Sequence, residues 1–273
     1  MPSEPESRRA DPGQVGGPVT ERPVVYSINL DADTERLARQ VSMLDLSAVE
    51  HVRIPAIRGM SLPHAAMRFI PGADVEAPGT LGCFLSHMTA WETLLRSGRA
   101  GTVVLEDDAI LGDGFNAAVP LLSGHGRDLL FLNDRLVPYR TEDPADTADR
   151  EIAELAEVVE SRGALKQIAC GGDGYFLSAA GARALLCVVE RHGVHGDVDW
   201  FLLLCALGQT GIDAIDSNRT FRRKLRTLQE FYRIAAPVLS AASLRQPLVR
   251  HGRGVSSRRQ ENAVARAGTA DGA

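Results

Sequence analysis

Three consecutive carboxylates end an apolar run in the middle of the chain, at residues 102–108, Thr-Val-Val-Leu-Glu-Asp-Asp. The first four residues are apolar or β-branched, which is typical of a strand buried on both faces of a mostly parallel sheet. Such a strand delivers the residues that follow it to the carboxyl edge of the sheet, where open α/β folds bind their ligands. We therefore expect Glu106, Asp107 and Asp108 at a ligand-binding edge.

Adjacent carboxylates at such an edge repel one another and need a counter-ion when they are partly buried. Oxygen ligands with open coordination positions suit Mg²⁺ or Mn²⁺ that bridges to substrate phosphates. A simpler interpretation is also open, because Asp-Asp after a strand can cap a helix or hydrate a turn. A metal-assisted site that handles a nucleotide is the first hypothesis.

The other apolar segments alternate between strand and helix character. Residues 82–97 carry apolar side chains at three- and four-residue intervals, which predicts a helix. Strands are expected at 24–30, 52–54, 102–105, 128–132, 175–177 and 211–215, and further helices at 37–44, 180–191 and from 197 onward. Strands that alternate with helices indicate an α/β fold with a mostly parallel central sheet.

The composition divides the chain into three parts. Residues 1–22 are rich in Pro, Gly, Ser and charge, and are expected to be a disordered extension. Residues 23–218 form the expected domain, in which 58–80 cross over the site as a loop and 140–162 are a surface helix or mobile insertion. Residues 219–273 are a basic extension, largely disordered beyond about 250, and eleven Arg and Lys between 219 and 259 face one acidic residue.

The chain carries no sign of export or membrane insertion. Its N-terminus has no apolar run of the kind a signal peptide needs, and its longest apolar stretch, 201–207, is too short to span a bilayer. The four cysteines, which lack metal-site spacing, are expected to be small core residues in a reducing compartment: Cys83, Cys170, Cys187 and Cys205. The sequence predicts a cytoplasmic protein.

Five short blocks follow one another between residues 23 and 205. They are Asn29-Leu30-Asp31 with Arg36, Leu81-Gly82-Cys83-Phe84-Leu85-Ser86-His87 with Trp91, Leu105-Glu106-Asp107-Asp108-Ala109, Gly174-Tyr175 through Ser178 with Gly181-Ala182, and Asp199-Trp200. In this order the blocks resemble the bacterial glycosyltransferases of family 25, the lipooligosaccharide biosynthesis type. The resemblance is specific because the blocks are several and well separated.

The resemblance implies a GT-A-like nucleotide-sugar-binding fold and an inverting hexosyltransferase. It implies a UDP-sugar donor, with galactose as the guessed hexose, and a glycan or lipid-linked saccharide acceptor in lipopolysaccharide or other cell-surface glycan biosynthesis. A divalent ion, Mn²⁺ or Mg²⁺, would hold the diphosphate. The alternatives are a non-catalytic glycosyltransferase-like scaffold and another metal-dependent phosphoryl or nucleotidyl enzyme.

The blocks also suggest which residues would bind the donor and the metal. Asp108 is the first candidate for direct metal ligation, and Asp107 shares the metal with it. The expected donor-binding residues are Asn29, Asp31, Arg36, His87, Glu106, Asp107, Gly172 and Gly174. Arg36 instead fits an ion pair with Asp33, and His87 fits a packed core histidine.

Transfer also requires a general base for the acceptor hydroxyl. The candidates are Asp199 first, Asp197 second and Asp173 third, and the alternative for Asp199 is an N-cap. Gly172 and Gly174 would allow close approach to a sugar, as would Gly171, although a tight turn has the same composition. Trp200 fits either a sugar-stacking platform or the core.

The basic segment suggests a partner. The cations Arg222, Arg223, Lys224 and Arg226 fit peripheral contact with the anionic inner face of a membrane, where lipid-linked acceptors lie. Nucleic-acid binding is disfavoured because the chain has a formal net charge of −5 and few aromatic residues within this segment.

Overall fold

The computed structural model describes residues 23–74, 77–136, 152–162, 171–215 and 219–252. The strands are β1 (Val24–Asn29), β2 (His51–Pro55), β3 (Gly101–Glu106), β4 (Ala109–Leu111), β5 (Leu129–Phe131), β6 (Ile152–Glu154), β7 (Gly174–Ser178), β8 (Ala241–Leu244) and β9 (Val249–His251). The α-helices are α1 (Thr34–Leu46), α2 (His64–Met67), α3 (Pro78–Ser97), α4 (Phe115–Ala118), α5 (Leu155–Arg162), α6 (Ala179–His192), α7 (Val198–Asp213) and α8 (Arg219–Tyr232). The 3₁₀ helices are η1 (Gly59–Ser61) and η2 (Val119–His125).

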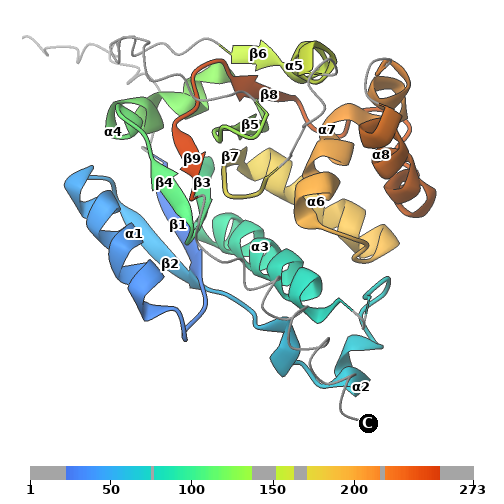
Figure 1. The fold of residues 1–273 in the computed structure, drawn as a ribbon, viewed down its shortest axis with the longest axis horizontal. Coiled ribbons are helices and arrows are strands. Elements are labelled where there is room, and N and C mark those ends of the chain that lie inside the picture. The colour runs from blue at the N-terminus through green and yellow to red at the C-terminus, as the bar shows by residue number, and fades with distance from the viewer. Residues whose placement is uncertain (1–22, 75–76, 137–151, 163–170, 216–218, 253–273) are drawn as a thin grey trace, which may run out of the picture.

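A seven-stranded sheet in the order β2-β1-β3-β7-β5-β8-β6 forms the centre of the molecule (Figure 1). β1 pairs in parallel with β2 and β3, and β5 with β8, whereas β7 and β6 run antiparallel to their neighbours. Five of the seven strands therefore point the same way. The predicted α/β class with a mostly parallel sheet is confirmed.

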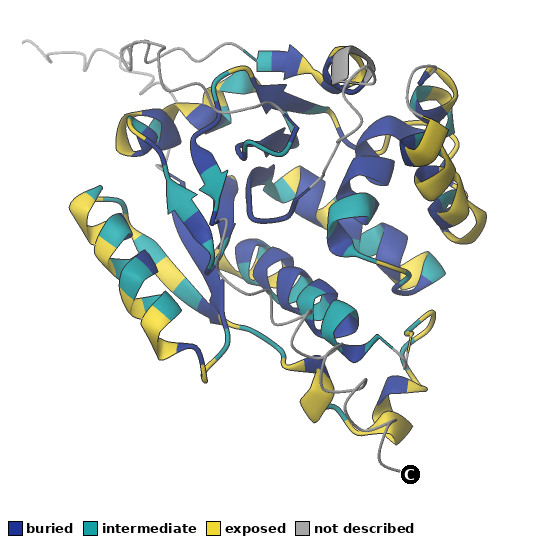
Figure 2. Cartoon of the chain, viewed as in Figure 1, coloured by how far each residue is buried: buried dark blue, intermediate teal, exposed yellow. Residues whose placement is uncertain are grey.

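The central strands are buried on both faces, as their continuous apolar runs predict. Alternate residues of β1 and β3 belong to two separate cores, Val24, Tyr26 and Val104 to one and Val25 and Val103 to the other. Helices α3, α6, α7 and α8 contribute to the first core, and α1, α4 and η2 to the second. The strands of the central sheet are largely buried, whereas α1 and α8 carry exposed residues on one side (Figure 2).

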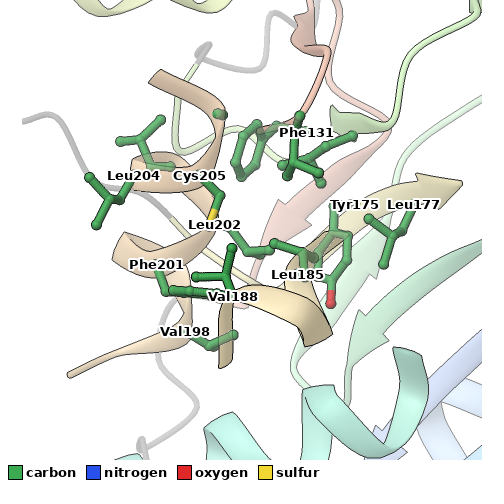
Figure 3. Close-up of a cluster of buried hydrophobic side chains, with 14 of the residues drawn as sticks. Phe131, Tyr175, Leu177, Leu185, Val188, Val198, Phe201, Leu202, Leu204 and Cys205 are labelled. Atoms are coloured by element: carbon green, nitrogen blue, oxygen red, sulfur yellow. The ribbon is translucent and has the colours of Figure 1, made fainter. Parts of the chain in front are cut away.

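In the larger core, side chains of α6 and α7 pack against side chains of β5 and β7. Leu185 of α6 and Phe201 and Leu202 of α7 pack there against Phe131 and Tyr175 (Figure 3). This packing fixes the start of α7 relative to β7. Since β7 is paired with β3, the first turn of α7 is also fixed relative to the carboxyl end of β3.

The expected strand at 211–215 is wrong. Residues 211–213 are the last residues of α7, which continues past a non-helical backbone at Gly208. At Gly208, with φ 59°, a Cβ would lie 2.5 Å from the carbonyl carbon of Ala236, so tertiary packing rather than local propensity shapes this segment.

The basic segment after residue 218 is part of the same folded body through residue 252. β8 lies between β5 and β6 in the central sheet, and β9 pairs with β4 in a small second sheet. The predictions for 1–22, for 140–151, for Cys170 and for the chain after 252 fall outside the described residues. Among the helices that the structure describes, none has the length and apolarity needed to cross a membrane.

Candidate functional site

A cleft of about 500 Å³ opens at the carboxyl ends of β1 and β3. Three segments line it: residues 28–33 with Arg36, residues 56–61, and α3 through Gly79, Cys83, Ser86 and His87; the carboxylates of 106–108 complete it. Ile28 pairs with Glu106 in the register of β1 and β3, so these parallel strands end together. The cleft lies where parallel α/β sheets place ligands.

All three carboxylates of residues 106–108 line this cleft because strand β3 ends at the first of them. Glu106 is the last residue of β3, and Asp107 and Asp108 form a turn before β4. In a continuous strand, successive side chains would point to opposite faces. Because residues 107 and 108 form a turn, this alternation does not apply and the three carboxylates lie along one cleft.

Asp107 is held by partners from β1 and α1. Its Oδ2 accepts a hydrogen bond from Asn29 Nδ2 at 2.8 Å, and its Oδ1 pairs with an Arg36 guanidinium nitrogen at 3.0 Å. Arg39 donates to its backbone carbonyl, and Gln40 donates to that of Glu106. Burial nevertheless raises the pKa of Asp107, and the bonds to Asn29 and Arg36 oppose that effect. This arrangement anchors the turn.

Asp108 has a different environment. Its Oδ1 is buried and has no hydrogen-bond partner among the described residues. Burial, and then the charges of Glu106 and Asp173, raise the pKa of Asp108 to about 6, while His251 opposes the shift. Its Oδ2 is 4.0 Å from His251 Nδ1.

Asp173 belongs to an ion-pair cluster behind Asp108. Its Oδ1 is 3.1 Å from Arg135 Nε, and its Oδ2 is 3.4 Å from His251 Nδ1. The hydrogen bond to Asp173 is the main cause that raises the pKa of His251. The Asp173 side chain is only 2% exposed. This third base candidate is therefore a buried member of an ion-pair cluster.

Helix α3 brings Cys83 and His87 to the cleft. At Gly82 a Cβ would lie 2.4 Å from the carbonyl oxygen of Ile57, so the helix can approach this loop only through a glycine. The Ser86 hydroxyl accepts a hydrogen bond from the Ile57 backbone N–H at 2.8 Å. Of the cysteines expected in the core, Cys83 instead lines the cleft, with its Sγ 3.8 Å from Glu106 Oε1.

Asp199 and Gly172 meet beside Glu106 and His87. Asp199, in the first turn of α7, accepts a hydrogen bond from the Gly172 backbone N–H at 2.7 Å. At Gly172 a Cβ would lie 2.8 Å from that carboxylate oxygen, 3.2 Å from His87 Cε1 and 3.3 Å from Glu106 Oε1. The absence of a side chain thus lets the first base candidate approach the acidic turn.

The remaining sequence candidates lie apart from this meeting point. Asp197 is the N-cap residue of α7 and lines a separate groove of about 380 Å³ with Trp200, whose ring lies 4.2 Å from Lys224 Nζ. At Gly174 a Cβ would lie 3.0 Å from the Val249 side chain, so strand β9 covers this glycine.

Asp31 lines the cleft, but its side chain is 84% exposed and paired with Arg53.

Two donor sets in the cleft suit a metal ion. Glu106 and Asp108 offer oxygen ligands, and the unpartnered Asp108 Oδ1 fits a hard divalent cation such as Mg²⁺ or Mn²⁺. Donor atoms of Cys83, His87 and Glu106 also lie within 4.8 Å of one another. That sulfur- and nitrogen-containing set is softer and suits Zn²⁺ better than Mn²⁺.

Sequence reasoning missed several residues that complete the site. Arg39 and Gln40 of α1 hold the turn, and Arg135 and His251 neutralise Asp173. Local sequence gives no signal for Arg135 and His251, since each is brought to Asp173 only by the sheet order. Tyr175 lies in a recognised block, but nothing in the sequence indicates its hydrogen bond to His87.

Comparison with known proteins places the chain among glycosyltransferases. The model of "Glycosyltransferase family 25 (LPS biosynthesis protein)" matches residues 23–200, more than half of the chain. A glycosyltransferase 25 family member of Drosophila melanogaster is 25% identical over 167 residues, covering 53% of this chain and 27% of the relative. One of Anopheles gambiae is 37% identical over 95 residues, covering 31% and 16%.

A third relative carries a different description. The inactive glycosyltransferase 25 family member 3 of Mus musculus is 27% identical over 184 residues, 62% of this chain and 29% of the relative. The chain thus spans less than a third of each of these relatives. A solved glycosyltransferase involved in glycosylation of the PBCV-1 major capsid is 9% identical with a TM-score of 0.38, over 90% of this chain and 98% of that one.

Proposed function

The chain belongs to glycosyltransferase family 25, and we propose that it transfers a hexose from a UDP-sugar to a saccharide acceptor with inversion. The observation that carries the proposal is the pair Glu106 and Asp108, which line a cleft of about 500 Å³ and of which Asp108 keeps a buried Oδ1 with no hydrogen-bond partner among the described residues. Cavities of this size suit a small organic ligand. A divalent cation held by these carboxylates would satisfy the orphaned oxygen and offset the clustered negative charge.

The proposed donor site uses both halves of the cleft. Asn29 and Asp31, at the end of β1 and in the loop after it, would contact the nucleoside, and the partly exposed Arg36 of the same cleft would contact a phosphate. Glu106 and Asp108 would hold Mn²⁺ or Mg²⁺. When bound, the ion supplies charge stabilisation for the departing diphosphate.

Asp199 is the proposed general base. Its carboxylate is oriented by the Gly172 backbone N–H and lies beside Glu106 and His87. In the proposed step the acceptor oxygen forms a bond to the anomeric carbon, the bond from that carbon to the donor phosphate oxygen breaks, and the acceptor proton passes to Asp199. We prefer Asp199 to Asp197 because Asp197 lines the separate groove.

The acceptor and setting are also proposals. The family description names lipopolysaccharide biosynthesis, which supports a role in the synthesis of lipopolysaccharide or another cell-surface glycan. Galactose as the hexose and the cytoplasm as the location complete the proposal. In α8, Arg222 donates to the Ile215 carbonyl, and the exposed Arg226 pairs with Asp213, whereas the exposed Arg223 and Lys224 form no ion pair with an acidic side chain among the described residues. Membrane contact would therefore depend on Arg223 and Lys224, and lack of binding to anionic vesicles at low salt would eliminate it.

A non-catalytic scaffold is the second candidate function, because a relative covering 62% of this chain is described as inactive. The intact acidic turn and the approach of Asp199 to it favour turnover. A scaffold that retains the cleft would bind UDP without transferring sugar. A phosphoryl or nucleotidyl enzyme would instead consume the diphosphate, so the products distinguish these alternatives.

Calorimetric titration of UDP with and without Mn²⁺ tests the donor site. We expect binding that depends on Mn²⁺, is lost in Asp108→Ala, and is retained in Asp113→Asn, which changes an exposed carboxylate outside the cleft. Metal-independent binding, or no binding to the folded protein, would contradict the proposal. UDP-sugar screening with Asp199→Asn then tests transfer, since this variant should bind UDP but turn over at least 100-fold more slowly.

A further inference from the structure

A chain of hydrogen bonds runs from the core to the cleft. Trp91 Nε1 donates to the Tyr175 hydroxyl oxygen at 2.9 Å, which lies 2.8 Å from His87 Nδ1, and His87 Nε2 lies 3.2 Å from Glu106 Oε1. Trp91, Tyr175 and His87 are fully buried, whereas Glu106 lines the cleft. The chain therefore joins a rigid interior to a residue of the proposed donor site.

The chemistry of these groups fixes the direction of each bond. An indole N–H can only donate, so the Tyr175 oxygen accepts from Trp91. The Tyr175 proton then needs an acceptor, and of the two partners this hydroxyl has among the described residues, only His87 Nδ1 can accept. A buried hydroxyl without an acceptor is costly, so Nδ1 carries no proton. His87 Nε2 carries the proton instead and donates to Glu106 Oε1.

The packing around His87 prevents the imidazole ring from rotating away from these hydrogen bonds. The His87 and Tyr175 rings stack with centroids 5.7 Å apart and an interplanar angle of 22°. Helix α3 is fixed against the loop at Ile57 by Gly82 and Ser86. The ring cannot flip without breaking hydrogen bonds on both sides.

We propose that Tyr175 fixes His87 in the Nε2–H tautomer and that His87 is thereby the positioning residue for Glu106. The consequence for UDP-sugar binding rests on the proposed function, whereas the tautomer does not. The proposed tautomer also distinguishes the two donor sets of the cleft, because it is incompatible with a metal ion on His87. Zn²⁺ on His87 Nε2, with Cys83 and Glu106, would move the ring proton to Nδ1 and leave the Tyr175 proton without an acceptor.

Nitrogen-15 NMR of the histidine rings in metal-free full-length protein tests the tautomer directly. The His87 signals are identified among those of the seven histidines by their loss in His87→Gln. We expect a proton bonded to Nε2 and none on Nδ1. A proton on Nδ1, alone or together with one on Nε2, overturns the proposal.

Two near-isosteric or aromatic replacements then test the role of the hydroxyl. Because Nε2–H also donates to Glu106, the tautomer is compared in Glu106→Ala, where Tyr175 is the remaining described hydrogen-bond partner of the ring: it should stay Nε2–H with Tyr175 present and become a mixture of both tautomers when Tyr175→Phe is added. Tyr175→Phe alone should give a two- to tenfold loss of Mn²⁺-dependent UDP affinity, about the effect of one hydrogen bond. Trp91→Phe removes a donor but leaves the bond from Tyr175 to His87, so the Nε2–H tautomer and the affinity should persist. An unchanged tautomer when Tyr175→Phe is added to Glu106→Ala overturns the proposal. Failure of wild-type protein to bind UDP defeats the proposed function instead, and the NMR result still decides the tautomer.

Discussion

Asp107 and Asp108 are neighbours in the chain, but the structure treats them in opposite ways. Around Asp107, Asn29 and Arg36 satisfy both carboxylate oxygens. Around Asp108, a buried carboxylate oxygen has no hydrogen-bond partner in the described part of the chain, and Glu106 adds like charge. The comparison shows that the Asp107 side of the turn, called here the Asp107 flank, is a structural anchor. The Asp108 side, the Asp108 flank, keeps a carboxylate oxygen that no described residue satisfies and that the proposed cation would bind.

Replacement of Asp107 should give the largest loss of stability. Asp107→Ala removes the partner of Arg36 in a partly buried ion pair, so the loss should approach, but stay below, the about 3–5 kcal/mol typical of a fully buried pair. Urea denaturation of the metal-free protein measures the difference. Asp107→Asn, which can still bond to Asn29, should lose less, and equal stability of Asp107→Ala and wild type would show that this flank is not an anchor.

Replacement of Asp108 should have the opposite sign. An unfolded Asp titrates near 3.9, but the pKa of Asp108 in the fold is about 6, so the folded state binds this proton more tightly. The contribution of Asp108 to stability therefore falls as pH rises from about 4 to 6. Above pH 6, metal-free Asp108→Asn should be more stable than wild type by up to about 3 kcal/mol.

The two proteins should converge near pH 4, where the wild-type carboxyl is also uncharged. Denaturation curves at several pH values in the presence of a chelator give this difference directly. Mn²⁺ should stabilise wild type but not Asp108→Asn, reversing the order. A difference that does not change between pH 4 and 7 would mean that ionisation of Asp108 is not what destabilises this flank.

Gly172→Ala should separate transfer from binding. The new Cβ would lie 2.8 Å from the Asp199 carboxylate oxygen, so that flexible side chain must move away from the acidic turn. Displacement of a catalytic group by about 1 Å can cost about 100-fold in rate. We expect a loss of that order in kcat with UDP binding and stability retained. Gly124→Ala is the matched control, because apart from its chain neighbours no atom of the described residues lies within 4 Å of the added Cβ, and it should behave as wild type.

The two flanks also differ in how far sequence could predict them. The Asp107 flank is built from β1, α1 and β3, whose apolar patterns identify them, and parallel pairing brings their ends together. The donor residues expected there, including Asn29 and Arg36, lie in one cleft. Local pattern and the sheet edge rule were sufficient for this part of the fold.

The Asp108 flank depends on contacts that no local pattern encodes. Arg135 follows β5 and His251 ends β9, yet both meet Asp173 beside Asp108. β8 is a four-residue strand without clear alternation, so the segment after 218 read as an extension, and the sheet order that includes it was not predictable. The tertiary fold, rather than residue chemistry, decides which charges neutralise this flank.

Replacement of Asp31 should give the smallest change in stability and shows how far the anchor around Asp107 extends. Its carboxylate is 84% exposed and pairs with Arg53, which also donates to Asn29 at 3.2 Å and 3.1 Å. Exposed ion pairs contribute about 0–1 kcal/mol, so Asp31→Asn should change the free energy of unfolding by less than about 1 kcal/mol. Arg53→Ala should cost more because it also removes bonds to the buried Asn29. If Asp31→Asn destabilises as much as Asp107→Ala, the anchor extends to the rim of the cleft and is not confined to the buried turn.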